Sequence, residues 1–169
     1  MSRNTLIIFS KCPKCIDFYL KLQEIYPFLF EEFGGRVEKC SDNQYGCDIW
    51  INAKGVVIWF ETAPQDGVEL GYGISLSVDD PDNKLNNTHF IGTILDFIDN
   101  KQPPEYKGPG WMDDRISTPE QLKKALEKII EFYNSDQFAD QVREFNEWYE
   151  RYEDIFRDSI KRYYKDHHS

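Results

Sequence analysis

A change in the spacing of apolar residues along the chain is the sequence feature that most constrains its fold. Apolar side chains recur at near-helical intervals from Ile16 to Ile25, alternate with polar or small residues from Val68 to Val78, and return to helical intervals after residue 118. Intervals of three and four residues mark one face of a helix, whereas strict alternation marks one face of a strand. The chain is therefore predicted to be an α+β protein with a sheet between helical segments.

The N-terminal segment is predicted to contain one short strand and one helix. Residues 5 to 9, Thr-Leu-Ile-Ile-Phe, are a short β-prone run, and a helix is expected over about residues 14 to 33. Pro27 interrupts the apolar pattern of this helix. Gly34-Gly35 follows at the place where many helices end with a residue of positive φ.

An antiparallel meander of about four strands is predicted next. Its strands cover Arg36 to Cys40, the residues around Ile49 to Ile51, Val56 to Phe60, and Val68 to Val78. Two turn sequences, Lys54-Gly55 and Pro64-Gln65-Asp66-Gly67, are short enough for hairpins between the later strands.

Three helices complete the predicted fold. A short amphipathic helix over residues 90 to 98 ends at a Pro/Gly-rich loop, and Thr118-Pro119-Glu120-Gln121 has the pattern of a helix capping box. The long last helix carries a largely aromatic stripe from Phe138 to Tyr163, suited to core packing, a partner or a homodimer. The chain has 169 residues and no long linker, so a single domain over residues 1–169 is predicted.

The chain is strongly acidic, with a formal net charge of −10 and a pI near 4.8. Such a charge repels nucleic acid and anionic membranes, so neither is a predicted partner. The sequence shows no secretory signal and no apolar run near the roughly 20 residues that span a bilayer. A cytoplasmic protein with reduced cysteines is therefore expected.

The negative charge is concentrated in one part of the chain. Residues 41 to 118 hold thirteen acidic and five basic side chains, a net of −8. Acidic loops beside an aromatic residue are typical of surfaces that bind a basic protein, although turn and helix-capping chemistry also uses such residues. The predicted partner-binding residues are Asp79, Asp80, Asp82, Trp111, Asp113 and Asp114.

Cys12-Pro13-Lys14-Cys15 is the motif with the clearest chemical interpretation. It follows a predicted strand and precedes a predicted helix, so this segment of about twenty residues resembles the start of a glutaredoxin. The resemblance implies a reactive Cys12 thiolate and a redox pair with Cys15. The predicted meander that follows departs from the βαβ continuation of that family. A thiol oxidoreductase is therefore one alternative function.

The four cysteines together allow a zinc site. Zinc in structural sites takes four tetrahedral ligands, and thiolates are common among them. Cys12 and Cys15 have typical ligand spacing, whereas six residues separate Cys40 from Cys47. A zinc-stabilised interaction domain using all four is thus a second alternative, and buried free thiols that act as small apolar residues are a third interpretation.

The predicted order of elements, the small size and the acidity resemble the immunity proteins of bacterial toxin systems, such as contact-dependent inhibition. The segment from Tyr26 to Gly34 also resembles a stretch in short bacterial proteins of unassigned function. The first resemblance implies a protein that binds and neutralises a secreted toxin domain, often a basic nuclease. It assigns no site residue. The leading hypothesis is a cytoplasmic protein-binding module, without catalysis and without a cofactor.

Overall fold

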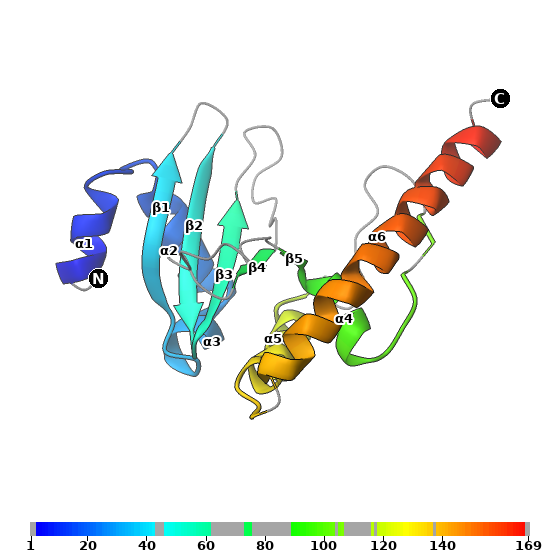
Figure 1. Cartoon of the computed structure of the whole chain (residues 1–169). Helices are drawn as coiled ribbons and strands as arrows, with labels where there is room; N and C mark the ends of the chain where they lie inside the picture. Colours follow the sequence, from blue (N-terminus) through cyan, green and yellow to red (C-terminus); the bar gives the residue numbers. More distant parts are fainter. Residues whose placement is uncertain are drawn as a thin grey trace. The chain divides into compact units, whose positions relative to one another are not determined.

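The computed structural model describes residues 3–42, 46–61, 73–75, 89–103, 105–106, 116, 118–136 and 138–167 (Figure 1). The chain divides into two compact units, Met1–Ile91 and Gly92–Ser169, called the N-terminal and C-terminal units below. The mixed helix and sheet content confirms the α+β class. The single domain over residues 1–169 stays a prediction.

Three short helices begin the N-terminal unit: α1 (Arg3–Phe9), α2 (Cys15–Ile25) and α3 (Pro27–Glu31). The predicted strand at residues 5 to 9 is wrong, because this segment is α1. Its buried side chains are Thr5 and Phe9, four residues apart, while Leu6 and Ile7 are exposed. Burial at this spacing requires a helix, so packing has overridden the β propensity of the segment.

The predicted helix over residues 14 to 33 is divided in two at Pro27. Proline lacks an N–H and disfavours the helical conformation in the residue before it, so α2 ends at Ile25 and α3 begins with Pro27. Gly34 follows α3 with a φ of +65°, which confirms the predicted helix stop. The Gly35 amide donates to the Leu29 carbonyl at 2.7 Å, and a Cβ on Gly35 would lie 2.5 Å from that oxygen.

The sheet is antiparallel, with neighbouring strands in chain order. Its strands are β1 (Arg36–Asp42), β2 (Cys47–Ala53), β3 (Val56–Glu61), β4 (Gly73–Ser75) and β5 (His89–Phe90). The predicted meander is confirmed, but the count of about four is not met. Three full strands carry the sheet, and β4 and β5 add only three and two residues. Most of the predicted strand from Val68 to Val78 lies outside the described residues.

The hairpin between β2 and β3 follows from local sequence. Lys54 and Gly55 both have positive φ, as a two-residue turn between β2 and β3 requires. One face of β2 is buried, with Ile49, Ile51 and Ala53 fully enclosed on the side where α2 contacts the sheet. In Figure 1, α2 lies behind β1 and β2. This face forms the core of the N-terminal unit.

The opposite face of the sheet carries an aromatic cross-strand pair. Trp50 and Trp59 are opposite each other on β2 and β3, and their ring centroids are 6.4 Å apart. The Lys39 ammonium lies 4.7 Å from the Trp50 ring, and the Trp59 indole donates to Asp48 at 3.1 Å. Both tryptophans are half-buried.

The C-terminal unit confirms the three predicted helices: α4 (Ile91–Ile98), α5 (Pro119–Tyr133) and α6 (Phe138–His167). Thr118 and Gln121 form the predicted capping box at the start of α5. The Phe97 ring lies between 5.1 and 5.8 Å from the rings of Phe132, Phe145 and Trp148. The aromatic stripe of α6 therefore contributes to a core within this unit.

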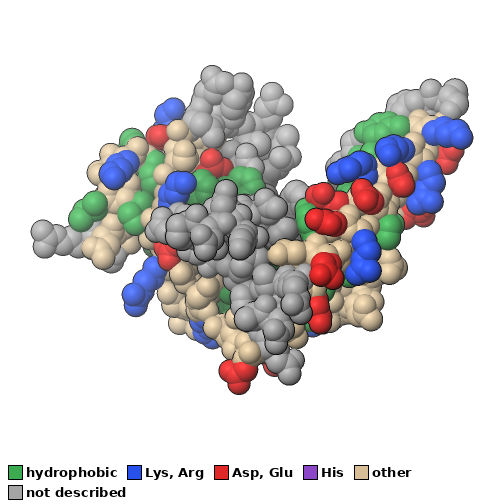
Figure 2. Space-filling view, in the orientation of Figure 1, with side chains coloured by type: hydrophobic (Ala, Val, Ile, Leu, Met, Phe, Trp, Pro, Cys, Tyr) green, Lys and Arg blue, Asp and Glu red, His purple; other side chains and the backbone are tan. Residues whose placement is uncertain are grey.

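The exposed side of α6 carries mixed charge, as Figure 2 shows. Arg157 lies within ion-pair distance of Glu153 and Asp154, and Lys161 of Asp158. Among the described helices, none has an apolar stretch of the length needed to cross a membrane.

Candidate four-cysteine site

The first two cysteines lie at the turn that joins α1 to α2. Cys12 is in the turn and Cys15 is the first residue of α2. The Cys12 amide donates to Phe9 at 3.2 Å, and the Cys15 amide donates to Cys12 at 3.0 Å. This tight turn keeps the two cysteines close together, and both side chains are buried, at 1% and 0% exposure.

The other two cysteines lie on the hairpin of β1 and β2. Cys40 pairs with Ile49, and Cys47 lies two residues before Ile49 on the same strand. Residues two apart on a strand point to the same face, so Cys40 and Cys47 share the side of the sheet that carries buried Ile49. The hairpin thus brings together two cysteines that six residues separate in sequence.

The structure joins the four cysteines in two disulfides, Cys12–Cys40 and Cys15–Cys47. Their Cα atoms are 6.2 and 5.4 Å apart, within the usual range for disulfides. Each bond connects the α1–α2 turn to the hairpin. The interpretation of the four cysteines as free thiols is thereby corrected: the fold places every cysteine next to another one.

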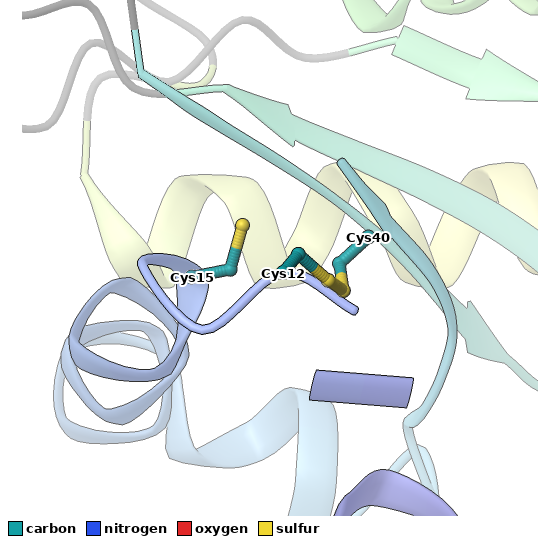
Figure 3. A group of neighbouring side chains, drawn as sticks. All are labelled: Cys12, Cys15 and Cys40. Atoms are coloured by element: carbon teal, nitrogen blue, oxygen red, sulfur yellow. A yellow bond between two sulfur atoms is a disulfide. The ribbon is translucent and has the colours of Figure 1, made fainter. Parts of the chain in front are cut away.

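Three of the four sulfur atoms form one compact cluster. The Sγ atoms of Cys12, Cys15 and Cys40 lie within 4.8 Å of one another (Figure 3), and Cys47 joins them through its bond to Cys15. Zn–S bonds of about 2.3 Å place the sulfurs of a tetrahedral site about 3.8 Å apart. Cys12, Cys15 and Cys40 therefore lie near the spacing of zinc ligands, and Cys47, next to Cys15, is the candidate for the fourth ligand once the disulfides are reduced.

The basic residues next to the cysteines in sequence do not all face the site. Three cysteines directly follow a lysine in sequence, in the pairs Lys11-Cys12, Lys14-Cys15 and Lys39-Cys40. All three lysines are exposed. The Lys39 ammonium lies over the Trp50 ring, on the face of the sheet opposite to the one that carries Cys40, so it does not offset the charge of thiolates at the site.

The arrangement is less suited to the alternative redox enzyme. A thiol–disulfide exchange reaction needs an accessible attacking thiolate, whereas Cys12 and Cys15 are both buried. They are also bonded to hairpin cysteines and not to each other. The geometry favours a structural site over the redox pair predicted from the glutaredoxin-like start.

The predicted partner-binding residues lie outside the described part of the chain. These residues are Asp79, Asp80, Asp82, Trp111, Asp113 and Asp114. The acidic surface that they were predicted to form therefore stays a prediction from the sequence.

No protein-family model, no curated protein and no solved structure matches the chain. Any functional assignment therefore depends on the site itself and on the charge of the sequence.

Proposed function

We propose that this chain is a protein-binding module whose N-terminal unit is stabilised by a zinc ion on Cys12, Cys15, Cys40 and Cys47. One observation carries the proposal: the sulfurs of Cys12, Cys15 and Cys40 lie within 4.8 Å of one another, and the Cys47 sulfur is bonded to that of Cys15. A zinc ion with four protein ligands has no open position for a substrate. The ion would accordingly stabilise the fold and would not perform catalysis.

The elements that the site connects need such a cross-link. α1 has only seven residues, and a helix this short is unstable in water without tertiary contacts. α1 also exposes two of its large apolar side chains, Leu6 and Ile7. A zinc ion at the end of the following turn would hold α1 and α2 against the sheet.

The proposed partner is a basic protein, and toxin immunity is the specific form of this proposal. The net charge of −10 would accelerate encounter with a positively charged surface. A cytoplasmic location, which belongs to the same proposal, would keep the cysteines reduced and so favour zinc over disulfides.

Metal analysis of the full-length protein tests the zinc site. Protein purified in reducing buffer is expected to contain about one zinc ion per chain, since a closed site holds a single ion. Alkylation should reach the thiols only after a chelator removes the metal. The Cys12→Ser/Cys15→Ser double variant should lose the zinc, whereas the exposed-site control Ser10→Ala should retain it. Reduced, metal-free protein with an intact sheet would overturn the proposal.

Charge reversal tests the proposed binding surface. Changing Asp79, Asp80, Asp113 and Asp114 to Lys is expected to weaken binding to a basic nuclease domain and to reduce the salt dependence of that binding. A matched control reverses four exposed acidic residues of α6: Glu144, Glu147, Glu150 and Asp154. Equal losses in both variants would mean that only the overall charge matters.

A further inference from the structure

We infer that the four-cysteine site has two exclusive states and acts as a redox switch, an inference that rests on the proposed zinc site. In the reduced state the four thiolates bind one zinc ion. In the oxidised state the disulfides Cys12–Cys40 and Cys15–Cys47 use the same sulfurs, so the ion is released.

The disulfide connectivity supports this inference. Both bonds run between the α1–α2 turn and the hairpin, and neither closes Cys12 onto Cys15. Each oxidised pair therefore makes the same connection between segments that the zinc ion would make. The Cα separations already suit disulfides, so oxidation requires movement of side chains and no rearrangement of the chain. The N-terminal unit keeps its fold in both states.

The exposure of the cysteines indicates where oxidation begins. Cys12, Cys15 and Cys47 are buried, whereas Cys40 is partly exposed and follows the exposed Lys39. Oxidation of thiols by peroxide is faster at accessible thiolates. Cys40 is therefore the point of entry, and its disulfide partner Cys12 is the residue that attacks it next.

The reaction balances with a hydroperoxide as oxidant. A Cys40 thiolate attacks hydrogen peroxide to give a sulfenic acid and hydroxide, and the Cys12 thiolate then displaces hydroxide from that sulfur. Cys15 and Cys47 follow in the same way with a second peroxide. Four thiolates lose four electrons in total, and two peroxides with four protons become four water molecules. Disulfide sulfurs are poor ligands for zinc, so the ion leaves as Zn²⁺.

Peroxide titration of the reduced, zinc-loaded, full-length protein tests the switch. A chromogenic chelator follows zinc release, and mass spectrometry of unreduced peptides identifies the disulfides. The expected result is release of the whole zinc content together with the Cys12–Cys40 and Cys15–Cys47 pairs. Zinc retained after oxidation, or a Cys12–Cys15 disulfide, would overturn the switch but leave the zinc site intact. A reduced protein without zinc would overturn both, and this is visible before peroxide is added.

Two single variants test the order of oxidation. Cys40→Ser and Cys47→Ser each remove one ligand, but only the first removes the partly exposed thiol. Zinc release by peroxide is expected to be about tenfold slower in Cys40→Ser than in Cys47→Ser. Trapping with a sulfenic-acid reagent on the unaltered protein should label Cys40 first, which needs no variant to fold. First labelling at Cys12 or Cys15, or equal release rates, would contradict the assigned entry point.

Discussion

The two units of the molecule are stabilised in different ways. The N-terminal unit combines short helices with a sheet, and all four cysteines of the chain lie in it. The C-terminal unit contains the two longest helices, α5 and α6, and no cysteine. Its described core is rich in aromatic contacts, such as those of Phe97 with Phe145 and Trp148. The cross-links therefore lie in the unit that contains the two shortest helices, α1 and α3.

This difference reflects how far apart in sequence the contacting residues of each unit lie. α5 and α6 gain stability from near neighbours in sequence, through the Thr118 cap, i,i+4 ion pairs and the stacked rings of Tyr152 and Phe156. The contacts between α1 and β1 join segments separated by about thirty residues. Such long-range contacts must first overcome loop-closure entropy, and a disulfide or metal removes much of that cost.

Removal of both the disulfides and the proposed zinc ion is expected to have the largest effect. It should also distinguish the stabilities of the two units most clearly. The disulfides span 28 and 32 residues, so each contributes about 3–4 kcal/mol in the chain-entropy account. With a strong reductant and a zinc chelator, amide exchange over residues 36–61 should approach that of an unfolded chain. Helices α5 and α6 should stay protected, because no cysteine lies in them. Simultaneous loss of protection in both units would contradict the comparison.

The converse experiment truncates the aromatic core of the C-terminal unit. Phe145 is 5% exposed and contacts both Phe97 and Trp148. Phe145→Ala is expected to destabilise this unit by about 3–5 kcal/mol, because it removes buried apolar surface and leaves a cavity. Chemical denaturation followed by exchange of peptides from α5 and α6 measures the loss. Phe145→Leu, as the matched control, should cost less, and residues 36–61 should be unaffected in both variants.

The same contrast explains how much of the fold could be predicted. The capping box at Thr118 and the positive φ of Gly34 depend on neighbouring residues, so the sequence pattern located both. α1 was mistaken for a strand because its β-branched residues favour a strand, whereas distant packing decided the outcome. Pro27 divides the predicted first helix because it both interrupts the apolar pattern and disfavours the helical conformation at Tyr26.

The sequence identified the four cysteines of the candidate site, but not how they are arranged in space. The six-residue spacing of Cys40 and Cys47 counted against zinc, because short spacings are usual for zinc ligands. The hairpin brings Cys40 and Cys47 together: Cys40 pairs with Ile49, and Cys47, two residues before Ile49, lies on the same face of the sheet. Register is fixed by the buried face of a sheet, and alternation in Cys47, Ile49 and Ile51 was the available signal.

Loss of the α5 cap is expected to have a smaller effect, confined to the C-terminal unit. The Thr118 hydroxyl accepts a hydrogen bond from the Gln121 amide at 3.3 Å. Thr118→Ala should destabilise the unit by about 1 kcal/mol, since an N-terminal amide of the helix loses its partner. Thr118→Ser retains the oxygen and should restore most of the loss in urea denaturation. If serine and alanine gave the same loss, the cap would not be the cause.

The ion pair between Asp99 and Lys128 should give the smallest effect, and one that depends on pH. The hydrogen bond from Lys128 lowers the pKa of Asp99 below its usual value, and Lys101 lowers it further. A lowered pKa in the folded state adds stability above the unfolded pKa of about 3.9, and this stability is lost as the pH falls through the folded pKa. The Lys128 side chain is 43% exposed, so solvent screening limits the contribution to about 0.5 kcal/mol.

Lys128→Met should therefore destabilise the C-terminal unit slightly at pH 7, and the difference from the unaltered protein should vanish once Asp99 is protonated. Urea denaturation at pH 7 and near pH 2 measures the free energy of unfolding in both states. Lys124→Met is the matched control, because its pair with Glu120 is highly exposed on the same helix. A loss that persists unchanged in acid would instead indicate that the Lys128 methylene groups stabilise α5 by packing.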